Sequence, residues 1–363
     1  MSGTTFRVAR NHEIDGFRAL AVIIVILSHL DFKFFPGQTG VSLFFVISGF
    51  VITGSILREV TNLSNFSIKN FYKRRALKLL PPLFFIISLP SFFVAEQINA
   101  PAVLSQIFFY FNWQYFQTST EGILPGSQVV WSLSVEEQYY ISIAIIVLIV
   151  VKLALNVCVK ILALIYLLLY VYSVASRVLI YSTSDSQNYW GDIPRILYGT
   201  DTRMSSIAIG GLAAIYLQSR QFSSSHVQKF QKHRFLIHSS LVLLISFSVF
   251  IRDPFFRNSL KYVIQELVCA LLIVVVSNSS LRYQIFSRLL KSKLLQLIGL
   301  ASYSIYLSHL VLIILLRDSG VLSDLGVRGL FEKVLIFCCV VSLGILLHLT
   351  VDRPFEKIRN SFR

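Results

Sequence analysis

The sequence predicts an all-α integral membrane protein, a bundle of about ten transmembrane helices with both termini in the cytoplasm. Of its 363 residues, 55% are hydrophobic and only 14% are charged, whereas soluble domains carry about a quarter charged residues. Apolar runs of about 17–25 residues, the length that crosses a bilayer, recur from end to end. Helices are expected because the bilayer core offers no water to backbone polar groups.

Ten runs fit this length, and we expect them to form one polytopic domain over residues 1–363, with no appended extracytoplasmic hydrolase-like domain. The segment 102–116 is shorter and more aromatic, so it is predicted to be interfacial or re-entrant, with an eleventh crossing as the alternative. The ten predicted spans are 14–35, 40–57, 79–95, 129–151, 159–181, 203–218, 235–251, 260–277, 294–316 and 330–351.

Basic residues predict the orientation of these spans. The outer segment 96–128 contains no Lys or Arg, and an eleventh crossing would place most of the later basic loops outside. The positive-inside rule therefore favours ten spans with both termini in the cytoplasm, and the expected location is the cytoplasmic (inner) membrane. The net charge of +15 is explained by these loops, so lipid is the expected partner rather than nucleic acid. The first inner loop carries Arg58, Lys69, Lys73, Arg74, Arg75 and Lys78.

The first span carries charged residues into apolar sequence, in the stretch EIDGFRALAVIIVILSHL that begins at Glu13. Asp15, Arg18 and His29 fall on one helical stripe, and His29 lies roughly 16 Å deeper than Arg18. Charges at this depth cost several kcal/mol and usually serve function. His29 is therefore a candidate base, with a hydrogen-bonded structural histidine as the alternative.

Two further spans carry polar side chains. In VVWSLSVEEQYY (129–140), Ser132, Glu136 and Tyr140 share a face, while Glu137 points elsewhere. Glu136 can pair with Arg18 or orient His29, or it can form a purely structural ion pair.

In LASYSIYLSHLV (300–311), Tyr303, Tyr306 and His309 form a polar ladder. His309 is either a second candidate base or a structural partner of tyrosine.

Two motifs lie at span ends. In NFYKRRALKLLPPLFF (70–85), Arg74, Arg75 and Lys78 cluster on one helical surface, where they can clamp phosphates or anchor the loop on anionic lipid. In YGTDTRMSSIAIGG (198–211), Asp201 and Arg203 lie at an outer mouth, and the small residues after them permit close helix packing.

Neither metal nor permanently bound cofactor is expected. We find no Walker loop and no zinc-ligand spacing. The four cysteines lie in or beside apolar segments and are interpreted as packing residues: Cys158, Cys269, Cys338 and Cys339.

Taken in order, EIDGFRALAV…SH, GVSLFFVISGFVI, FYKRRALKLLPP, WSLSVEEQYY, TDTR and SYSIYLSH resemble the motifs of the bacterial membrane acyltransferase family 3. This family contains O-acetyltransferases of surface polysaccharides. The resemblance covers nearly the whole chain. It implies transfer of an acyl group, usually acetyl, from cytoplasmic acetyl-CoA or another acyl-CoA to a carbohydrate hydroxyl outside.

By the same resemblance, His29 and Arg18 match the family's catalytic histidine and companion arginine, and Glu136 matches an acid of the tryptophan-serine-leucine motif. Arg74 and Arg75 match the basic motif, whose third arginine is Lys78 here. Lysine keeps the charge but loses the bidentate fork. Asp15 joins the candidate catalytic residues, and the candidate substrate-binding residues are Trp131, Ser134, Asp201, Arg203, Tyr303, Tyr306 and His309.

The chemistry of the residues agrees with this resemblance. CoA is anionic and cannot cross lipid, so an inner basic loop is suited to hold it. His29 then deprotonates the acceptor hydroxyl, or carries the group as an acyl-histidine. The alternatives are succinyl transfer, another class of membrane O-acyltransferase, and a carrier that moves a polar solute without chemistry. Lipopolysaccharide O-antigen, exopolysaccharide and other glycans, some lipid-linked, all remain open as acceptors, and so does the oligomeric state.

Overall fold

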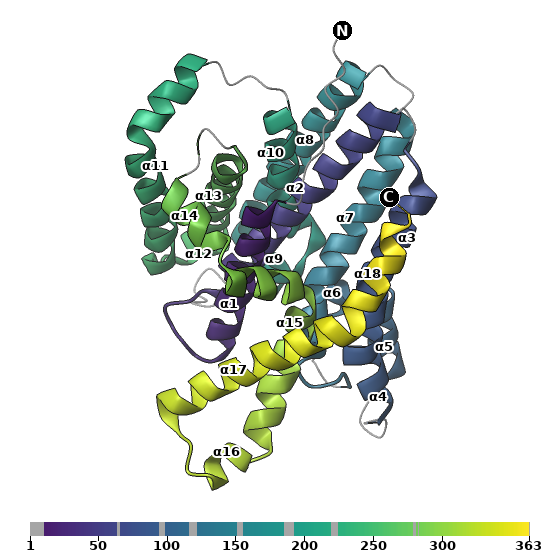
Figure 1. Ribbon diagram of the computed structural model, residues 1–363, viewed down its shortest axis with the longest axis vertical. Helices are drawn as coiled ribbons and strands as arrows, with labels where there is room; N and C mark the ends of the chain where they lie inside the picture. The colour runs from purple at the N-terminus through teal and green to yellow at the C-terminus, as the bar shows by residue number, and fades with distance from the viewer. Residues whose placement is uncertain are drawn as a thin grey trace. The chain divides into compact units, whose positions relative to one another are not determined.

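A computed structural model describes residues 11–63, 66–93, 99–115, 122–150, 155–184, 192–218, 224–278, 281 and 283–362. All the regular structure in these ranges is helical (Figure 1). The all-α fold class is therefore confirmed. Parts of the predicted outer segment (96–98 and 116–121) and the span ends 94–95 and 151 lie outside the described ranges.

Seven helical stretches among the described residues are long and apolar enough to cross a membrane, which makes the chain a multi-pass membrane protein. The total of ten spans and the cytoplasmic side of the termini stay predictions. The seven stretches are Gly37–Val60, Ser127–Val150, Val157–Thr183, Gln231–Phe250, Leu260–Ser277, Lys293–Asp318 and Gly329–Arg359.

The helices that contain these stretches are α2 (Gly37–Leu63), α7 (Trp131–Val150, after the 3-10 turn η3, Ser127–Val130), α8 (Leu155–Thr183), α11 (Ser224–Phe250), α13 (Leu260–Ser277), α15 (Lys293–Asp318) and α17 (Gly329–Leu347). The π-helical turn η5 (His348–Asp352) and α18 (Arg353–Asn360) continue α17.

The other three predicted spans are also helical. They correspond to α1 (His12–His29), to the run of α3 (Ile68–Leu83), π-helical η1 (Phe84–Ser88) and α4 (Leu89–Phe93), and to α10 (Thr200–Gln218). Between the long helices lie α9 (Pro194–Tyr198), α12 (Pro254–Asn258), α14 (Gln284–Leu290) and α16 (Val321–Asp324).

The first helix is shorter than predicted, since α1 ends at His29 rather than residue 35. Asp31 turns the chain with a φ of 61°, a left-handed conformation that ends a helix. Arg317 Nη2 donates to Asp31 Oδ2 at 3.0 Å, and Lys333 Nζ donates to the Asp31 carbonyl at 3.4 Å. The turn is thus held by two cations from later helices.

The segment 102–116 forms two short helices, α5 (Ala100–Ile107) and α6 (Phe111–Tyr115). They are separated at Phe109, whose φ is 56°. A crossing needs about 20 residues, so neither helix can cross alone. Residue 116 lies outside the described ranges.

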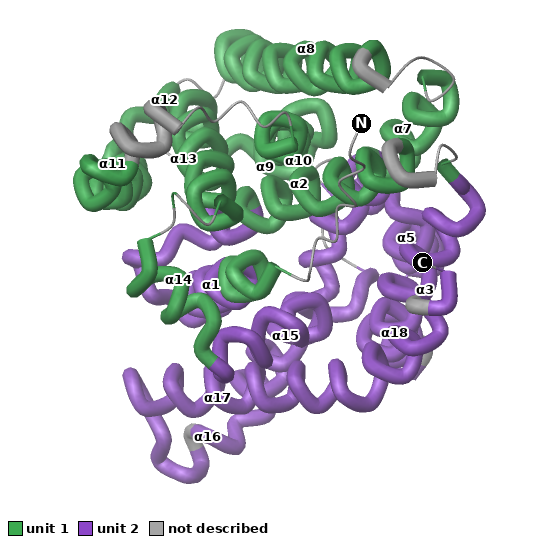
Figure 2. Tube along the Cα trace, turned by 45° about the horizontal axis from the view of Figure 1, so that its top comes forward, with its two compact units in different colours: residues 1–17, 42–66, 139–292 green, residues 18–41, 67–138, 293–363 purple. Residues whose placement is uncertain are grey.

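The chain folds as two compact units, each discontinuous in sequence (Figure 2). Unit 1 comprises residues 1–17, 42–66 and 139–292, and unit 2 comprises 18–41, 67–138 and 293–363. Helices α1, α2 and α7 each begin in one unit and end in the other. Most of the predicted site residues belong to unit 2.

In unit 1, glycines bring helices into close contact. A Cβ on Gly49 of α2 would collide with the carbonyl of Ile207 in α10, and a Cβ on Gly210 would collide with the carbonyl of Val46 in α2. The close packing predicted from the small residues of 198–211 is therefore confirmed.

In unit 2, α15 is the central helix, with α17, η3, η5 and α3 against it. Its own buried face includes Tyr306 and His309, two members of the polar ladder predicted from sequence, whereas Tyr303 is half-buried.

Candidate functional site

Two histidines from different helices face each other inside unit 2. His29 is the last residue of α1, and His309 lies in the middle of α15. Their ring centroids are 5.2 Å apart, with the ring planes inclined by 49°. His309 is fully buried and His29 partly buried. The two candidate bases of the sequence therefore form one imidazole pair.

The hydrogen bonding of His309 identifies its basic nitrogen. Nδ1 lies 2.6 Å from the carbonyl oxygen of Tyr306, and a carbonyl can only accept, so Nδ1 carries a proton. The lone pair of the neutral ring is then on Nε2, which is buried and has no hydrogen-bond partner among the described residues. A buried polar atom without a partner is costly, so Nε2 is suited to accept a hydrogen bond or a proton from a substrate.

Helix α7 joins this pair through the hydroxyl of Tyr306. That hydroxyl lies 2.8 Å from Ser132 Oγ, and Ser132 Oγ donates to the carbonyl of Val129. Trp131 and Ser134 are also buried, with the Ser134 hydroxyl directed at the Val130 carbonyl. The first turn of α7 thus packs beside the polar ladder of α15.

A cationic cluster forms around Lys78 in α3. The ammonium group of Lys78 interacts with the charges of Arg18 in α1, Arg75 in α3, Arg359 in α18 and Glu136 in α7. The pKa of Lys78 lies well below its usual range. Burial is the largest cause, the three guanidinium groups add to it, and Glu136 opposes it. Arg18, Arg75, Lys78 and Glu136, all candidates from the sequence, therefore share one neighbourhood.

The carboxylate bonded to Arg75 is that of Glu137, which sequence reasoning left out. Arg75 Nη2 donates to Glu137 Oε1 at 3.4 Å, and Glu137 is only 8% exposed. Its neighbour Glu136 was favoured because it shares a face with Ser132. The signal that could have identified Glu137 is its own charge inside an apolar span. Orientation of His29 by Glu136 stays a prediction.

Arg74 holds the C-terminal segment. Its Nη1 donates to the carbonyl of Phe362 at 2.9 Å, and the Lys73 ammonium lies 4.7 Å from the centre of the Phe362 ring. At the other end of α3, the hydroxyl of Tyr303 donates to the carbonyl of Leu79 at 3.0 Å. Tyr303 is therefore beside the cationic cluster rather than the imidazole pair.

The cationic cluster around Lys78 and the His29–His309 pair lie at different levels of unit 2. On α1, Arg18 and His29 are about 16 Å apart along the helix; on α15, Tyr303 and His309 are about 9 Å apart. In α7, Glu136 belongs to the cationic level and Ser132 to the imidazole level. The three helices thus connect a cationic level with an imidazole level.

The remaining candidates belong to unit 1. Asp15 is buried there, in the first part of α1. Both oxygens of Asp201 accept bonds of 2.5 Å from Arg195. Arg203 is fully buried; its Nη2 donates to Ser42 Oγ at 3.1 Å, and its guanidinium lies 4.8 Å from the centre of the Tyr262 ring.

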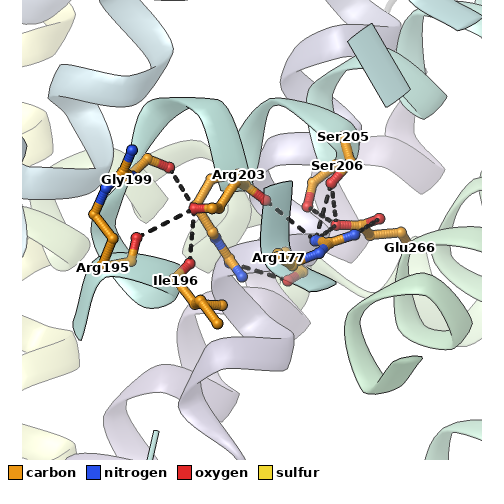
Figure 3. A network of polar contacts seen from close by, with 10 residues as sticks. Arg177, Arg195, Ile196, Gly199, Arg203, Ser205, Ser206 and Glu266 are labelled. Carbon is orange, nitrogen blue, oxygen red and sulfur yellow. Dashed lines mark hydrogen bonds and ion pairs between the residues drawn. The ribbon is translucent and has the colours of Figure 1, made fainter. Parts of the chain in front are cut away.

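Unit 1 also contains a buried ion pair that sequence reasoning missed (Figure 3). Arg177 of α8 and Glu266 of α13 are both fully buried, with Arg177 Nη1 3.0 Å from Glu266 Oε1. The hydroxyls of Ser205 and Ser206 in α10 donate to the same oxygen at 2.7 and 2.8 Å. Charges within predicted spans 159–181 and 260–277 were the available signal.

The fold and the site together define a multi-pass membrane protein with a buried histidine pair and a cationic cluster at one end of its helices. A family model described as an acyltransferase domain matches residues 11–351. The chain belongs to this acyltransferase family, which confirms the resemblance found in its motifs.

Curated relatives match along almost the whole chain. The chain is 29% identical over 351 residues to the putative peptidoglycan O-acetyltransferase YrhL of Bacillus subtilis, covering 91% of this chain and 53% of the relative. It is 26% identical over 361 residues to the O-acetyltransferase OatA of Staphylococcus aureus, covering 95% and 57%. The chain thus spans about half the length of these relatives. No solved structure matches.

Proposed function

We propose that the protein is a membrane-embedded O-acyltransferase. It moves an acyl group, most simply acetyl, from cytoplasmic acyl-CoA to a hydroxyl of a carbohydrate on the outer side of the cytoplasmic membrane. The observation that carries the proposal is the His29–His309 pair, which lies in the same unit as the cationic cluster. In this pair His309 Nε2 is buried and has no hydrogen-bond partner in the part of the chain that the structure describes. Two relatives of the chain are named as O-acetyltransferases, which supports the proposal.

The cationic cluster is the proposed donor site. Arg18, Arg75 and Lys78 bring three cations together, and CoA carries phosphates that guanidinium groups bind by charge-assisted hydrogen bonds. Arg74 holds the adjacent C-terminal segment. A thioester is already activated, so the reaction needs neither ATP nor a metal ion.

The imidazole pair is the proposed base. His29 takes the proton of the acceptor hydroxyl as its oxygen attacks the thioester carbonyl; the carbon–sulfur bond breaks, and CoA leaves as a thiolate that the same proton can neutralise. His309 Nε2 is proposed to share this proton. In the alternative route, an imidazole first takes the acyl group and then passes it to the hydroxyl. Glu136 and Asp15 stay candidate positioning acids.

The acceptor is proposed to be a cell-envelope glycan. The name of the Bacillus relative specifies peptidoglycan, while lipopolysaccharide O-antigen and exopolysaccharide offer similar hydroxyls, and a lipid-linked precursor would reach the same face. The proposed acceptor contacts come from Trp131, Ser134, Tyr303, Tyr306 and His309 in unit 2. Asp201 and Arg203, which belong to unit 1, stay predictions from the sequence.

An acyl-transfer assay on the purified protein, with radiolabelled acetyl-CoA and a panel of envelope glycans, tests this function. The expected result is an ester-linked label on one glycan with stoichiometric release of CoA, and the loss of both in His29→Ala. Full transfer by His29→Ala would exclude both histidine routes. A solute carrier would release no CoA, and a succinyltransferase would turn over succinyl-CoA faster. NMR of envelope glycans with and without the gene identifies the acceptor.

A further inference from the structure

We propose that the C-terminal helix α18 forms one wall of the donor site, and that Arg359 is a further residue that binds the phosphates of acyl-CoA. This inference rests on the proposed function in taking acyl-CoA as the donor. The family match ends at residue 351, whereas α18 begins at Arg353. The added cation therefore comes from a part of the chain that the family match does not include.

The end of α18 is fixed to the basic helix α3. Arg74 Nη1 donates to the carbonyl of Phe362, and the Lys73 ammonium lies over the Phe362 ring. One charge-assisted hydrogen bond and one cation–π contact thus join Phe362, two residues beyond the end of α18, to consecutive residues of α3.

This attachment sets the register between the two helices, which pack against each other. Lys78 lies about 6 Å beyond Arg74 along α3, and Arg359 precedes Phe362 by about one turn of chain. Since Phe362 contacts the earlier residues of α3, the preceding turn of α18 lies beside the later ones. Arg359 therefore faces the Lys78 neighbourhood.

The beginning of α18 is fixed as well. Asp352 Oδ2, one residue before the helix, accepts a hydrogen bond from Ser304 Oγ of α15 at 2.9 Å and lies 2.9 Å from His348 Nδ1. Arg359 itself bonds to Glu356 Oε1 at 2.9 Å, one turn earlier on α18. Both helix ends and the guanidinium are thus oriented before any ligand binds.

Arg359 completes the site chemically. The basic motif has lysine at position 78, which carries a charge but no bidentate fork. Arg359 supplies a guanidinium from the neighbouring helix. Burial lowers the pKa of Lys78 most, followed by the charges of Arg18, Arg75 and Arg359. The charges of Arg18, Arg75 and Arg359 disfavour a positive charge on Lys78, and a polyphosphate ligand would neutralise these cations.

The test measures CoA affinity of the detergent-solubilised full chain, together with the KM for acetyl-CoA, at several salt concentrations. Arg359→Gln should weaken CoA binding about tenfold, the effect of one lost charge-assisted hydrogen bond, and flatten its salt dependence. The KM should rise with little change in kcat. Arg359→Lys should recover part of the affinity.

Lys357→Gln is the matched control, because it removes the same charge from the exposed side of the same helix. It should change affinity less than twofold. The inference is overturned if Arg359→Gln binds CoA like the wild type, or if it loses affinity with the salt dependence unchanged, the mark of a structural role. A wild type that neither binds CoA nor releases it from acetyl-CoA would refute the proposed function instead.

Discussion

At the scale of single residues, the His29–His309 pair makes the sharpest prediction. If the two rings share one proton, His29→Ala and His309→Ala should each lower kcat by about 100-fold or more. The double variant should lose little beyond the worse single variant, since residues that act as a unit are non-additive. The rate of acyl transfer at saturating donor and acceptor gives kcat for the two single variants and the double variant.

The matched control is His238→Ala. His238 also contacts a backbone carbonyl through Nδ1, at 2.6 Å from Arg234 in α11, but it lies outside the predicted site. Its loss should leave kcat within about twofold. Multiplicative losses from the two site histidines would show that they act independently.

Lys78 predicts the pH dependence of donor binding. Its pKa is lowered by burial and by neighbouring guanidinium groups, so the free protein loses this positive charge as pH rises through a value below lysine's usual range. Affinity for CoA should therefore fall at alkaline pH, and CoA binding should take up protons there. Lys78→Arg should remove this fall, because arginine stays charged.

Titration of CoA binding by calorimetry at several pH values, in buffers of different ionisation enthalpy, measures both effects. Identical pH profiles for the wild type and Lys78→Arg would exclude Lys78 as the titrating group.

Residue identities could be predicted from sequence, but their partners could not. Arg18, Lys78 and Glu136 were candidates because each is charged at a span or span end, yet their common neighbourhood depends on contacts between distant segments. Similarly, the position of Asp201 beside the start of a predicted span placed it at a mouth but could not show that Arg195 binds both of its oxygens.

At the scale of helices, the Arg177–Glu266 pair predicts a large loss of stability. Removing one partner leaves the other charge buried and unpaired, which costs about 3–5 kcal/mol. Glu266→Gln should therefore unfold at a much lower temperature than the wild type in detergent. Adding Arg177→Met to Glu266→Gln should recover part of the loss, because no unpaired charge then remains.

The Arg257–Asp192 pair is the control for that measurement. It joins the same part of unit 1 at 3.3 Å, but its side chains are 29% and 25% exposed. Arg257→Gln should cost no more than about 1 kcal/mol. Equal losses of stability in Glu266→Gln and Arg257→Gln would contradict the burial of the Arg177–Glu266 pair.

Helices could be predicted from sequence more securely than their ends. Apolar runs located each long helix because their length matches a bilayer. The end of α1 depended on Asp31, whose left-handed turn is held by Arg317 and Lys333. Similarly, α3 begins eleven residues before the predicted span 79–95, since basic residues can continue a helix beyond the apolar run.

At the scale of the whole molecule, composition predicted the class but could not predict the two units. Each unit combines segments far apart in sequence, and three helices belong to both. The contact of Arg74 with Phe362 spans 288 positions, and a single sequence carries no signal for such a pairing.

The final prediction concerns topology, because the proposed donor site can bind acyl-CoA only if it faces the cytoplasm. Helix α1 joins the cationic level at Arg18 to the turn at Asp31, and its 18 residues extend about 27 Å, close to the thickness of a bilayer core. Residues beside its two ends should therefore react with reagents on opposite sides of the membrane. Lys69, exposed at the start of α3, reports one side, and Phe34, 79% exposed, reports the other.

In a variant lacking the four native cysteines, a membrane-impermeant maleimide should label Phe34→Cys in intact cells. Lys69→Cys should be labelled only after permeabilisation, since the basic loop is retained inside. Labelling of Lys69→Cys in intact cells would place the Arg74–Lys78 segment outside, where no acyl-CoA is present. A cationic cluster on the outer side could not bind acyl-CoA, whether or not His29 and His309 act as bases.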